Sequence, residues 1–128
     1  MNDLLLQALR ILVVDDDADS RGFMIVALEG EGAEVREAGS VSEALALISE
    51  WKPDVLISDI RMPDDDGYGL LRQIQERSLS IPAIALTAFA RNEDRAAALA
   101  AGFQCHLPKP VDLTELYAAI AVLADRSN

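Results

Sequence analysis

The chain has 128 residues, a length that fits one domain able to build its own hydrophobic core. Its 22 acidic and 11 basic residues give a net charge of −11, which argues against direct binding to nucleic acid or to an anionic membrane. No apolar run approaches the roughly 18 to 20 residues needed to span a bilayer, and the single cysteine excludes an internal disulfide. The sequence therefore predicts a soluble domain in the cytoplasm.

Residues 1–10 contain three consecutive leucines but neither a basic opening nor a cleavage site, so we expect a lead-in or linker there. Beyond it, short segments suited to buried strands alternate with longer segments of helical spacing. The predicted strands are 11–14, 33–37, 55–57, 83–86 and 103–107, of which 33–37 is the weakest. The predicted helices are 18–30, 41–51, 67–77, 92–101 and 112–124.

This alternation of five strands and five helices predicts an α/β domain over residues 11–125, followed by a short tail at 126–128. Strands joined through helices run parallel, and a parallel sheet is covered by helices on both faces. We therefore expect a three-layer sandwich.

Chemically active side chains follow the predicted strands at their carboxyl ends. Asp15 and Asp16 come after the first strand, Asp59 ends the third, Thr87 ends the fourth, and Lys109 follows the fifth. In an open parallel sheet, ligands bind beyond these ends, near the point where the strand order reverses. The topology thus predicts that these residues converge on one pocket.

Three crowded carboxylates repel one another unless a cation lies between them. Mg²⁺ suits such a site because it prefers oxygen ligands and needs only one or two carboxylates with a backbone carbonyl. A neutralised carboxylate can then attack phosphorus and form an acyl phosphate. Lys109 offers a cation and Thr87 a hydroxyl for the phosphoryl oxygens, and Asp59, on the central strand, is the predicted nucleophile.

The chain resembles a response-regulator receiver domain of two-component signalling, the CheY-like class, from residue 11 to about residue 124. The resemblance rests on four short motifs in the order and spacing of the family. They are Val-Val-Asp15-Asp16, the run from Ser58 to Pro63 leading to Asp66-Gly67, Leu86-Thr87-Ala88, and Pro108-Lys109-Pro110. The resemblance implies a flavodoxin-like (βα)5 fold with strand order 2-1-3-4-5.

The resemblance also implies a magnesium-dependent phosphorelay reaction on Asp59, with a sensor histidine kinase or a histidine phosphotransfer domain as the donor. Asp16 would bind Mg²⁺, or Mn²⁺ as the alternative, directly, and Asp59 would be a further metal residue. Asp15 would bind the ion through water and Arg61 through its backbone carbonyl.

Phosphoryl contacts would come from Thr87, the Ala88 backbone and Lys109, and the Lys109-Pro110 peptide would be cis. The domain would be a signalling module rather than an enzyme, although it would assist its own phosphorylation and dephosphorylation. It would be a monomer or a weak phosphorylation-dependent dimer. It would control a partner, a fused kinase or an output domain. The amino-acid sequence of residues 81–110 resembles that of receivers attached to hybrid histidine kinases.

Three positions allow two interpretations. His106 stands where many receivers carry Tyr or Phe, and it either packs or faces solvent without further role, or acts with Thr87 as a polar switch that responds to pH. Arg61 and Phe89, two residues beyond Asp59 and Thr87, are either solvated rim residues or hinder water and lengthen the phosphorylated lifetime, as the family suggests.

Three other classes of protein share parts of this pattern. A haloacid-dehalogenase phosphatase also uses an Asp nucleophile and Mg²⁺, but residues 15–19 lack the Thr or Val of its motif, and no cap domain fits in 128 residues. A flavodoxin needs a phosphate-binding loop where this chain has aspartates. A receiver-like interaction module that is never phosphorylated usually loses one of the key residues, and this chain loses none.

Overall fold

The structure, a computed structural model, describes residues 4–60, 66–88 and 92–125. Within these ranges strands and helices alternate, as predicted. The elements are β1 (Arg10–Val14), α1 (Ala18–Gly30), β2 (Glu34–Ala38), α2 (Val41–Trp51), β3 (Val55–Asp59), α3 (Gly67–Glu76), β4 (Ala83–Thr87), α4 (Asn92–Ala101), β5 (Cys105–Pro108) and α5 (Leu113–Asp125).

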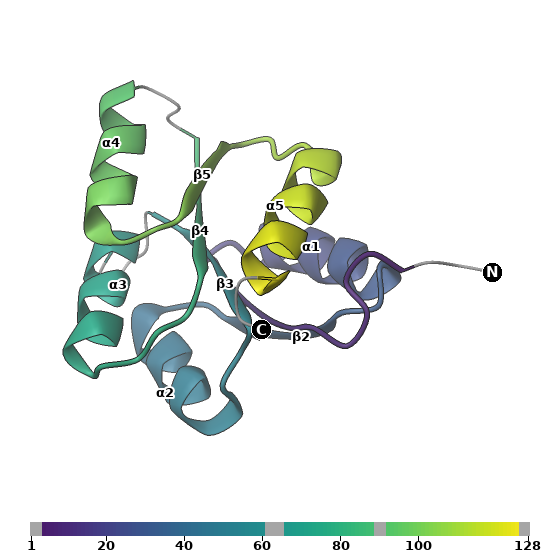
Figure 1. The fold of residues 1–128 in the computed structure, drawn as a ribbon, viewed down its shortest axis with the longest axis horizontal. Coiled ribbons are helices and arrows are strands. Elements are labelled where there is room, and N and C mark those ends of the chain that lie inside the picture. Colours follow the sequence, from purple (N-terminus) through teal and green to yellow (C-terminus); the bar gives the residue numbers. More distant parts are fainter. Residues whose placement is uncertain (1–3, 61–65, 89–91, 126–128) are drawn as a thin grey trace.

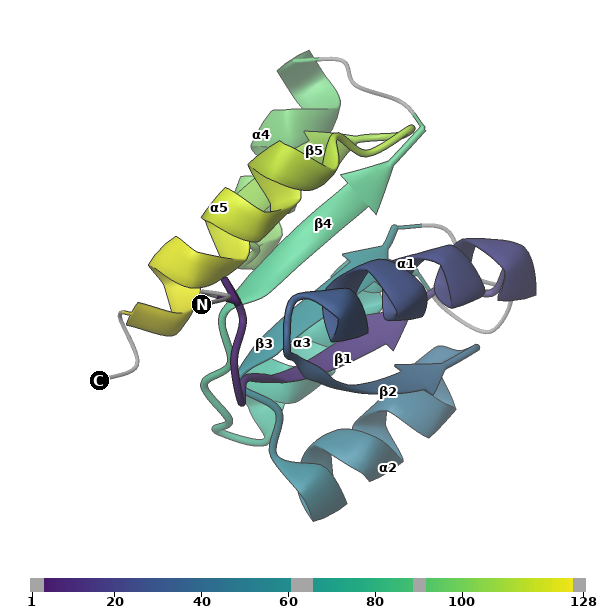
Figure 2. The same ribbon diagram turned by 90° about the vertical axis from the view of Figure 1, so that its right-hand side faces the viewer.

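The five strands form one parallel sheet with the order β2-β1-β3-β4-β5, which confirms the flavodoxin-like prediction. In Figure 1, α1 and α5 lie on one side of this sheet and α2, α3 and α4 on the other. Figure 2 shows the arrowheads of β1, β3 and β4 pointing toward the same edge. All carboxyl ends of the sheet are therefore at one end of the domain.

Each face of the sheet has its own core because successive strand residues point to opposite faces. Leu12 and Leu56 pack toward α2, α3 and α4, whereas Ile11 and Ile57 pack toward α1 and α5. The first three residues of β3 and the first four of β4 are apolar and buried, as expected for a parallel sheet covered on both faces, and polar residues appear only at the carboxyl ends of these two strands.

Aspartates begin two of the helices next to the carboxyl edge. Asp17 is the N-cap of α1 and accepts a hydrogen bond from the Asp19 amide, and Asp66 is the N-cap of α3 and accepts one from the Gly69 amide. A carboxylate at this position satisfies an otherwise unpaired helical N–H. These two acids therefore serve helix initiation.

The fifth strand begins two residues later than predicted, at Cys105 instead of Phe103. Gly102 has φ +116° and ends α4, and the Phe103 N–H donates back to the Ala98 carbonyl. Phe103 therefore belongs to the helix C-cap, where its ring is buried in the core.

Part of the predicted lead-in is built into the domain. Leu6 is fully buried in the core formed with α1 and α5, and its N–H donates to the Glu31 carbonyl. Arg10 is the first residue of β1. Across the described ranges, no helix has the length and apolar character needed to cross a membrane.

Candidate functional site

The five residues predicted at the strand ends meet at the carboxyl edge of the sheet: Asp15, Asp16, Asp59, Thr87 and Lys109. β3 lies between β1 and β4, so Asp59 at its end is flanked by the segment after β1 and by the end of β4. Asp59 is level with Leu86 in the register, one residue before Thr87, and Thr87 is level with Pro108, one residue before Lys109. Residues far apart in sequence thus become neighbours through strand pairing alone.

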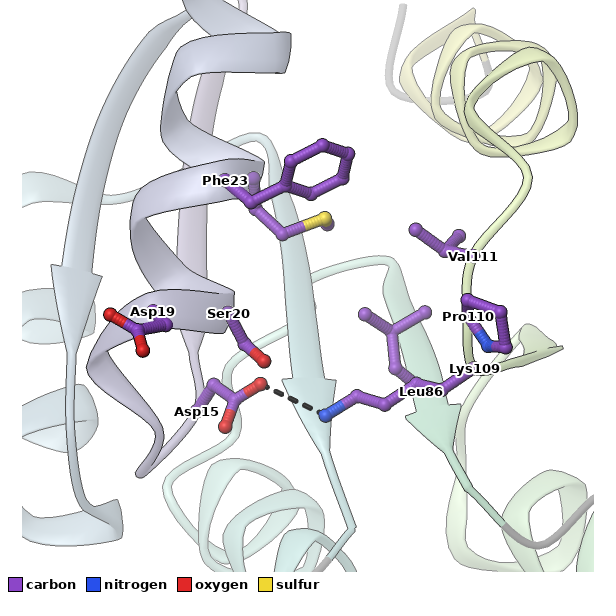
Figure 3. A pocket seen from close by; sticks show the side chains of 9 residues that line it. Asp15, Asp19, Ser20, Phe23, Leu86, Lys109, Pro110 and Val111 are labelled. Atoms are coloured by element: carbon purple, nitrogen blue, oxygen red, sulfur yellow. Dashed lines mark hydrogen bonds and ion pairs between the residues drawn. The ribbon is translucent and has the colours of Figure 1, made fainter.

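Lys109 joins two of the carboxylates. Its Nζ lies 3.0 Å from Asp15 Oδ2 and 2.9 Å from Asp59 Oδ2. Its backbone N–H donates to the Thr87 carbonyl at 2.8 Å, and its peptide bond to Pro110 is cis. Figure 3 shows the side chain extending from the segment after β5 toward Asp15. One ammonium group therefore links the ends of β1, β3 and β5.

Asp15, Asp16 and Asp59 form an acidic cluster in which one oxygen from each carboxylate lies within 4.8 Å of the others. Asp15 is buried, Asp59 is partly buried and Asp16 is exposed. These hard oxygen donors suit Mg²⁺ or a similar ion, which completes its shell with water. Their graded burial leaves an open side at Asp16 from which a hydrated ion can enter.

Burial raises the pKa of Asp15, and the nearby charge of Asp59 adds to this, while the Asp17 amide and Lys109 act in the opposite direction. For Lys109, burial alone would lower the pKa. The hydrogen bonds and charges of Asp59 and Asp15 outweigh burial, so the pKa of Lys109 is raised. Lys109 is therefore a permanent cation at neutral pH and offsets part of the negative charge of the cluster.

Thr87 is buried at the end of β4, and Ala88 follows it in an exposed position. His106 is only 5% exposed and belongs to β5, so it packs in the interior and does not face solvent. Its Nε2 has no hydrogen-bond partner among the residues that the structure describes. Burial lowers its pKa, and the charge of Arg95 on α4 adds to this, while Asp94 opposes it. Whether His106 acts as a switch stays a prediction.

A family model described as the response regulator receiver domain matches residues 11–121. The chain belongs to this family. Membership of this family excludes the haloacid-dehalogenase and flavodoxin alternatives. The prediction of a two-component protein is confirmed at the level of the receiver domain.

Individual receiver-containing proteins are similar over most of this chain. An uncharacterized 14.6 kDa protein of Leptolyngbya boryana is 50% identical over 108 residues, which are 83% of this chain and 82% of that protein. The transcriptional regulatory protein KdpE of Escherichia coli is 37% identical over 118 residues, 92% of this chain and 52% of KdpE. This receiver domain thus spans about half the length of KdpE.

Solved receiver domains have the same fold. The receiver domain of the Francisella response regulator 1452 superposes with a TM-score of 0.89 at 31% identity, covering 94% of this chain and 99% of that domain. The two chains therefore share the same fold.

Sequence reasoning missed Arg21 of this receiver domain. Its Nη1 donates to the Asp15 carbonyl at 2.7 Å, and its Nε pairs with Glu37 at 2.8 Å. The available signal was position: Arg21 is the only basic residue of α1, four residues after the Asp17 N-cap. Helical side chains point toward the N-terminus, so this one reaches the site edge.

The sequence also did not reveal a pocket of about 570 Å³ beside the Asp15–Lys109 ion pair. Its lining is mainly apolar, and Figure 3 shows Phe23 of α1 on one side and Pro110 and Val111 on the other. Phe23 is 57% exposed. Arg61 and Phe89, predicted to flank the site, lie outside the described residues.

Proposed function

We propose that this receiver domain accepts a phosphoryl group on Asp59 from the phosphohistidine of a sensor histidine kinase or a histidine phosphotransfer domain. The observation that carries the proposal is the position of the Lys109 ammonium, 2.9 Å from Asp59 and 3.0 Å from Asp15. A cation held beside the nucleophile is poised to bind an oxygen of the incoming phosphoryl group.

In the proposed reaction, an Asp59 carboxylate oxygen forms a bond to phosphorus as the bond between phosphorus and the donor imidazole breaks. The imidazole nitrogen keeps the electron pair of that bond. Lys109, the Thr87 hydroxyl and the Ala88 amide bind the phosphoryl oxygens, so positioning and charge stabilisation do most of the work.

Asp16 and Asp59, with Asp15 through water and the Arg61 carbonyl, would hold Mg²⁺ or Mn²⁺. When bound, the ion supplies positive charge to the transferring oxygens. The oxygen-only donor set and the exposed side of the cluster at Asp16 support this assignment.

The apolar pocket offers a binding surface for the protein that donates the phosphoryl group. It lies directly beside the Asp15–Lys109 pair and is bordered by the exposed ring of Phe23. An amphipathic helix that carries the phosphohistidine can bury apolar side chains there while its imidazole reaches Asp59. We expect Phe23→Ala to slow transfer from a phosphohistidine protein and to leave transfer from acetyl phosphate unchanged.

We also propose that a partner or output domain binds the face formed by α4, β5 and α5. Thr87 ends β4 beside Asp59 and His106 lies in the neighbouring strand β5, so a change at the phosphorylation site would reach this face through them. The domain would act as a phosphoacceptor in the cytoplasm and not as an enzyme with an external substrate. A hybrid-kinase origin, a stand-alone role and weak dimerisation stay predictions.

Intact-mass spectrometry after incubation with acetyl phosphate and Mg²⁺ tests the proposed function. We expect a gain of about 80 Da, one phosphoryl group, that is lost with EDTA and in Asp59→Asn. Asp54→Asn is the matched control, because Asp54 precedes β3 at the opposite end of the same strand. If no adduct forms and beryllofluoride does not bind, the domain is an interaction module that is never phosphorylated.

A further inference from the structure

The side chain of Arg21 ties the first helix to the backbone beneath the acidic cluster. Nη1 donates to the carbonyl oxygen of Asp15 at 2.7 Å, a short and therefore strong charge-assisted hydrogen bond. The side chain is only 19% exposed, so water competes weakly for this carbonyl. The Asp15 N–H is held as well, because it donates to the Ala38 carbonyl at 3.1 Å. Both backbone polar groups of Asp15 therefore have fixed partners.

The Asp15 carbonyl belongs to the peptide that joins Asp15 to Asp16. A peptide unit is planar, so an anchor on its oxygen also fixes the direction in which the chain continues to the Cα of Asp16. Asp16 is exposed, and its carboxylate is not held by burial as that of Asp15 is. Its aim toward Asp59 thus depends on the backbone that carries it.

Arg21 is itself held in place from two sides. Its Nε donates to Glu37 Oε1 of β2 at 2.8 Å. Its guanidinium also lies against Gly39, where an added Cβ would come within 3.2 Å of Nη1. The Gly39 N–H in turn donates to Glu43 of α2 at 3.2 Å. The guanidinium is therefore locked between β2, the loop after it, and the β1–α1 turn.

We propose that Arg21 is a positioning residue for metal binding: by anchoring the Asp15–Asp16 peptide to Glu37, it orients the Asp16 carboxylate toward Asp59. This inference rests on the proposed magnesium site. Glu37 neutralises the guanidinium, so Arg21 acts mainly through geometry and less through added positive charge. The planar fork of arginine presents two nitrogens in a fixed relation, which the single ammonium of lysine cannot reproduce.

Titration calorimetry of the whole chain with MgCl2 tests the proposal directly. We expect Arg21→Met to weaken Mg²⁺ binding about tenfold, the usual effect of losing a residue that orients a metal ligand. Arg21→Lys should weaken it nearly as much. Glu37→Gln should weaken it less, and the Arg21→Met, Glu37→Gln double variant should match Arg21→Met alone, because both residues act through one contact.

Arg10→Met is the matched control. Arg10 also pairs with a glutamate of β2, Glu34, and donates to a backbone carbonyl, that of Trp51, but it lies at the opposite end of β1. The variant removes the same charge and the same kinds of contact. It should leave Mg²⁺ affinity unchanged.

A second readout separates positioning from loss of structure. In acetyl phosphate reactions, Arg21→Met should need about ten times more Mg²⁺ for half-maximal rate and should reach a maximal rate within about twofold of wild type. If Arg21→Met binds Mg²⁺ as tightly as Arg10→Met does, or if Arg21→Lys restores wild-type affinity, the positioning role is overturned. If wild type itself binds no Mg²⁺ and gains no 80 Da adduct, the proposed function fails first, and this inference fails with it.

Discussion

Lys109 shares one ammonium group between the Asp15 and Asp59 carboxylates, at 3.0 and 2.9 Å. These two contacts of the Lys109 ammonium group are the ones most directly linked to the proposed chemistry. Asp15 is largely withdrawn from water, so the interaction is screened less than a surface pair would be.

We expect Lys109→Met to lower the rate of Asp59 phosphorylation by acetyl phosphate about 100-fold, since a lost donor to a developing anion typically costs this much. The rate of appearance of the 80 Da adduct measures it. Lys52, the other lysine of the chain, is exposed at the end of α2, so Lys52→Met is the control and should react like wild type. A Lys109→Met variant that is phosphorylated at the control rate would remove Lys109 from the mechanism.

Gly67 lies where α3 begins close under Asp59. A Cβ at this position would be 2.7 Å from the Asp59 carbonyl oxygen and 3.1 Å from the Ile60 Cα, both backbone atoms that cannot move aside easily. We expect Gly67→Ala to lower the free energy of unfolding by about 1–3 kcal/mol, measured by urea denaturation. Gly22, in the interior of α1, has open space, so Gly22→Ala should instead stabilise by roughly 0.5–1 kcal/mol. Equal effects of the two substitutions would show that the approach of α3 to Asp59 is not tight.

At the scale of elements, β5 and α4 enclose a buried titratable group. His106 has a lowered pKa because of burial and the charge of Arg95 on α4, opposed by Asp94. The fold thus favours the neutral imidazole. The contribution of the neutral imidazole to the free energy of unfolding is fully present above the unfolded-state pKa of about 6.5. It is lost as the pH falls through the lower pKa of the folded state.

We therefore expect wild type to lose unfolding free energy relative to His106→Phe between pH 7 and pH 5. Each unit by which the folded pKa lies below the unfolded value corresponds to about 1.4 kcal/mol. Urea denaturation of both proteins across this range measures the difference. Parallel pH profiles would mean that His106 remains as easily protonated in the folded domain as in the unfolded chain, and would remove the basis for a pH-dependent switch.

At the scale of the whole molecule, a net charge of −11 coexists with an acidic cluster at one edge of the sheet. Salt of any kind relieves general repulsion, whereas a bound ion stabilises the folded state specifically. At ten times its Kd, Mg²⁺ should add about 1.4 kcal/mol, or about 5 °C in Tm for a domain of this size. NaCl at equal ionic strength should give a smaller rise, and Asp16→Asn should abolish the excess. An equal rise with both salts would argue against a specific ion site.

Much of the fold and the location of the site were predictable from local patterns. The apolar run 55–57 and the helical spacing of 41–51 are properties of each segment taken alone. The boundaries predicted from them therefore agree with those of β3 and α2 within two residues. Phe103 was assigned to a strand in error because its apolar character suits a helix cap as well as a strand. Deciding between the two requires the left-handed conformation of Gly102 and the bond from Phe103 to Ala98.

The class of fold and the group of residues at the strand ends could be predicted from the order of residues along the chain, because periodicity is local and parallel topology brings every carboxyl end to one edge. Three features emerge only in the folded chain: Asp15 is buried while its neighbour Asp16 is exposed, Lys109 links Asp15 to Asp59, and Arg21 donates to the Asp15 carbonyl. Burial, pKa and hydrogen-bond partners depend on which distant segments pack together. The position of Arg21 in its helix and of Lys109 after its strand places both near the site, but which atoms they contact is set only when those segments pack together.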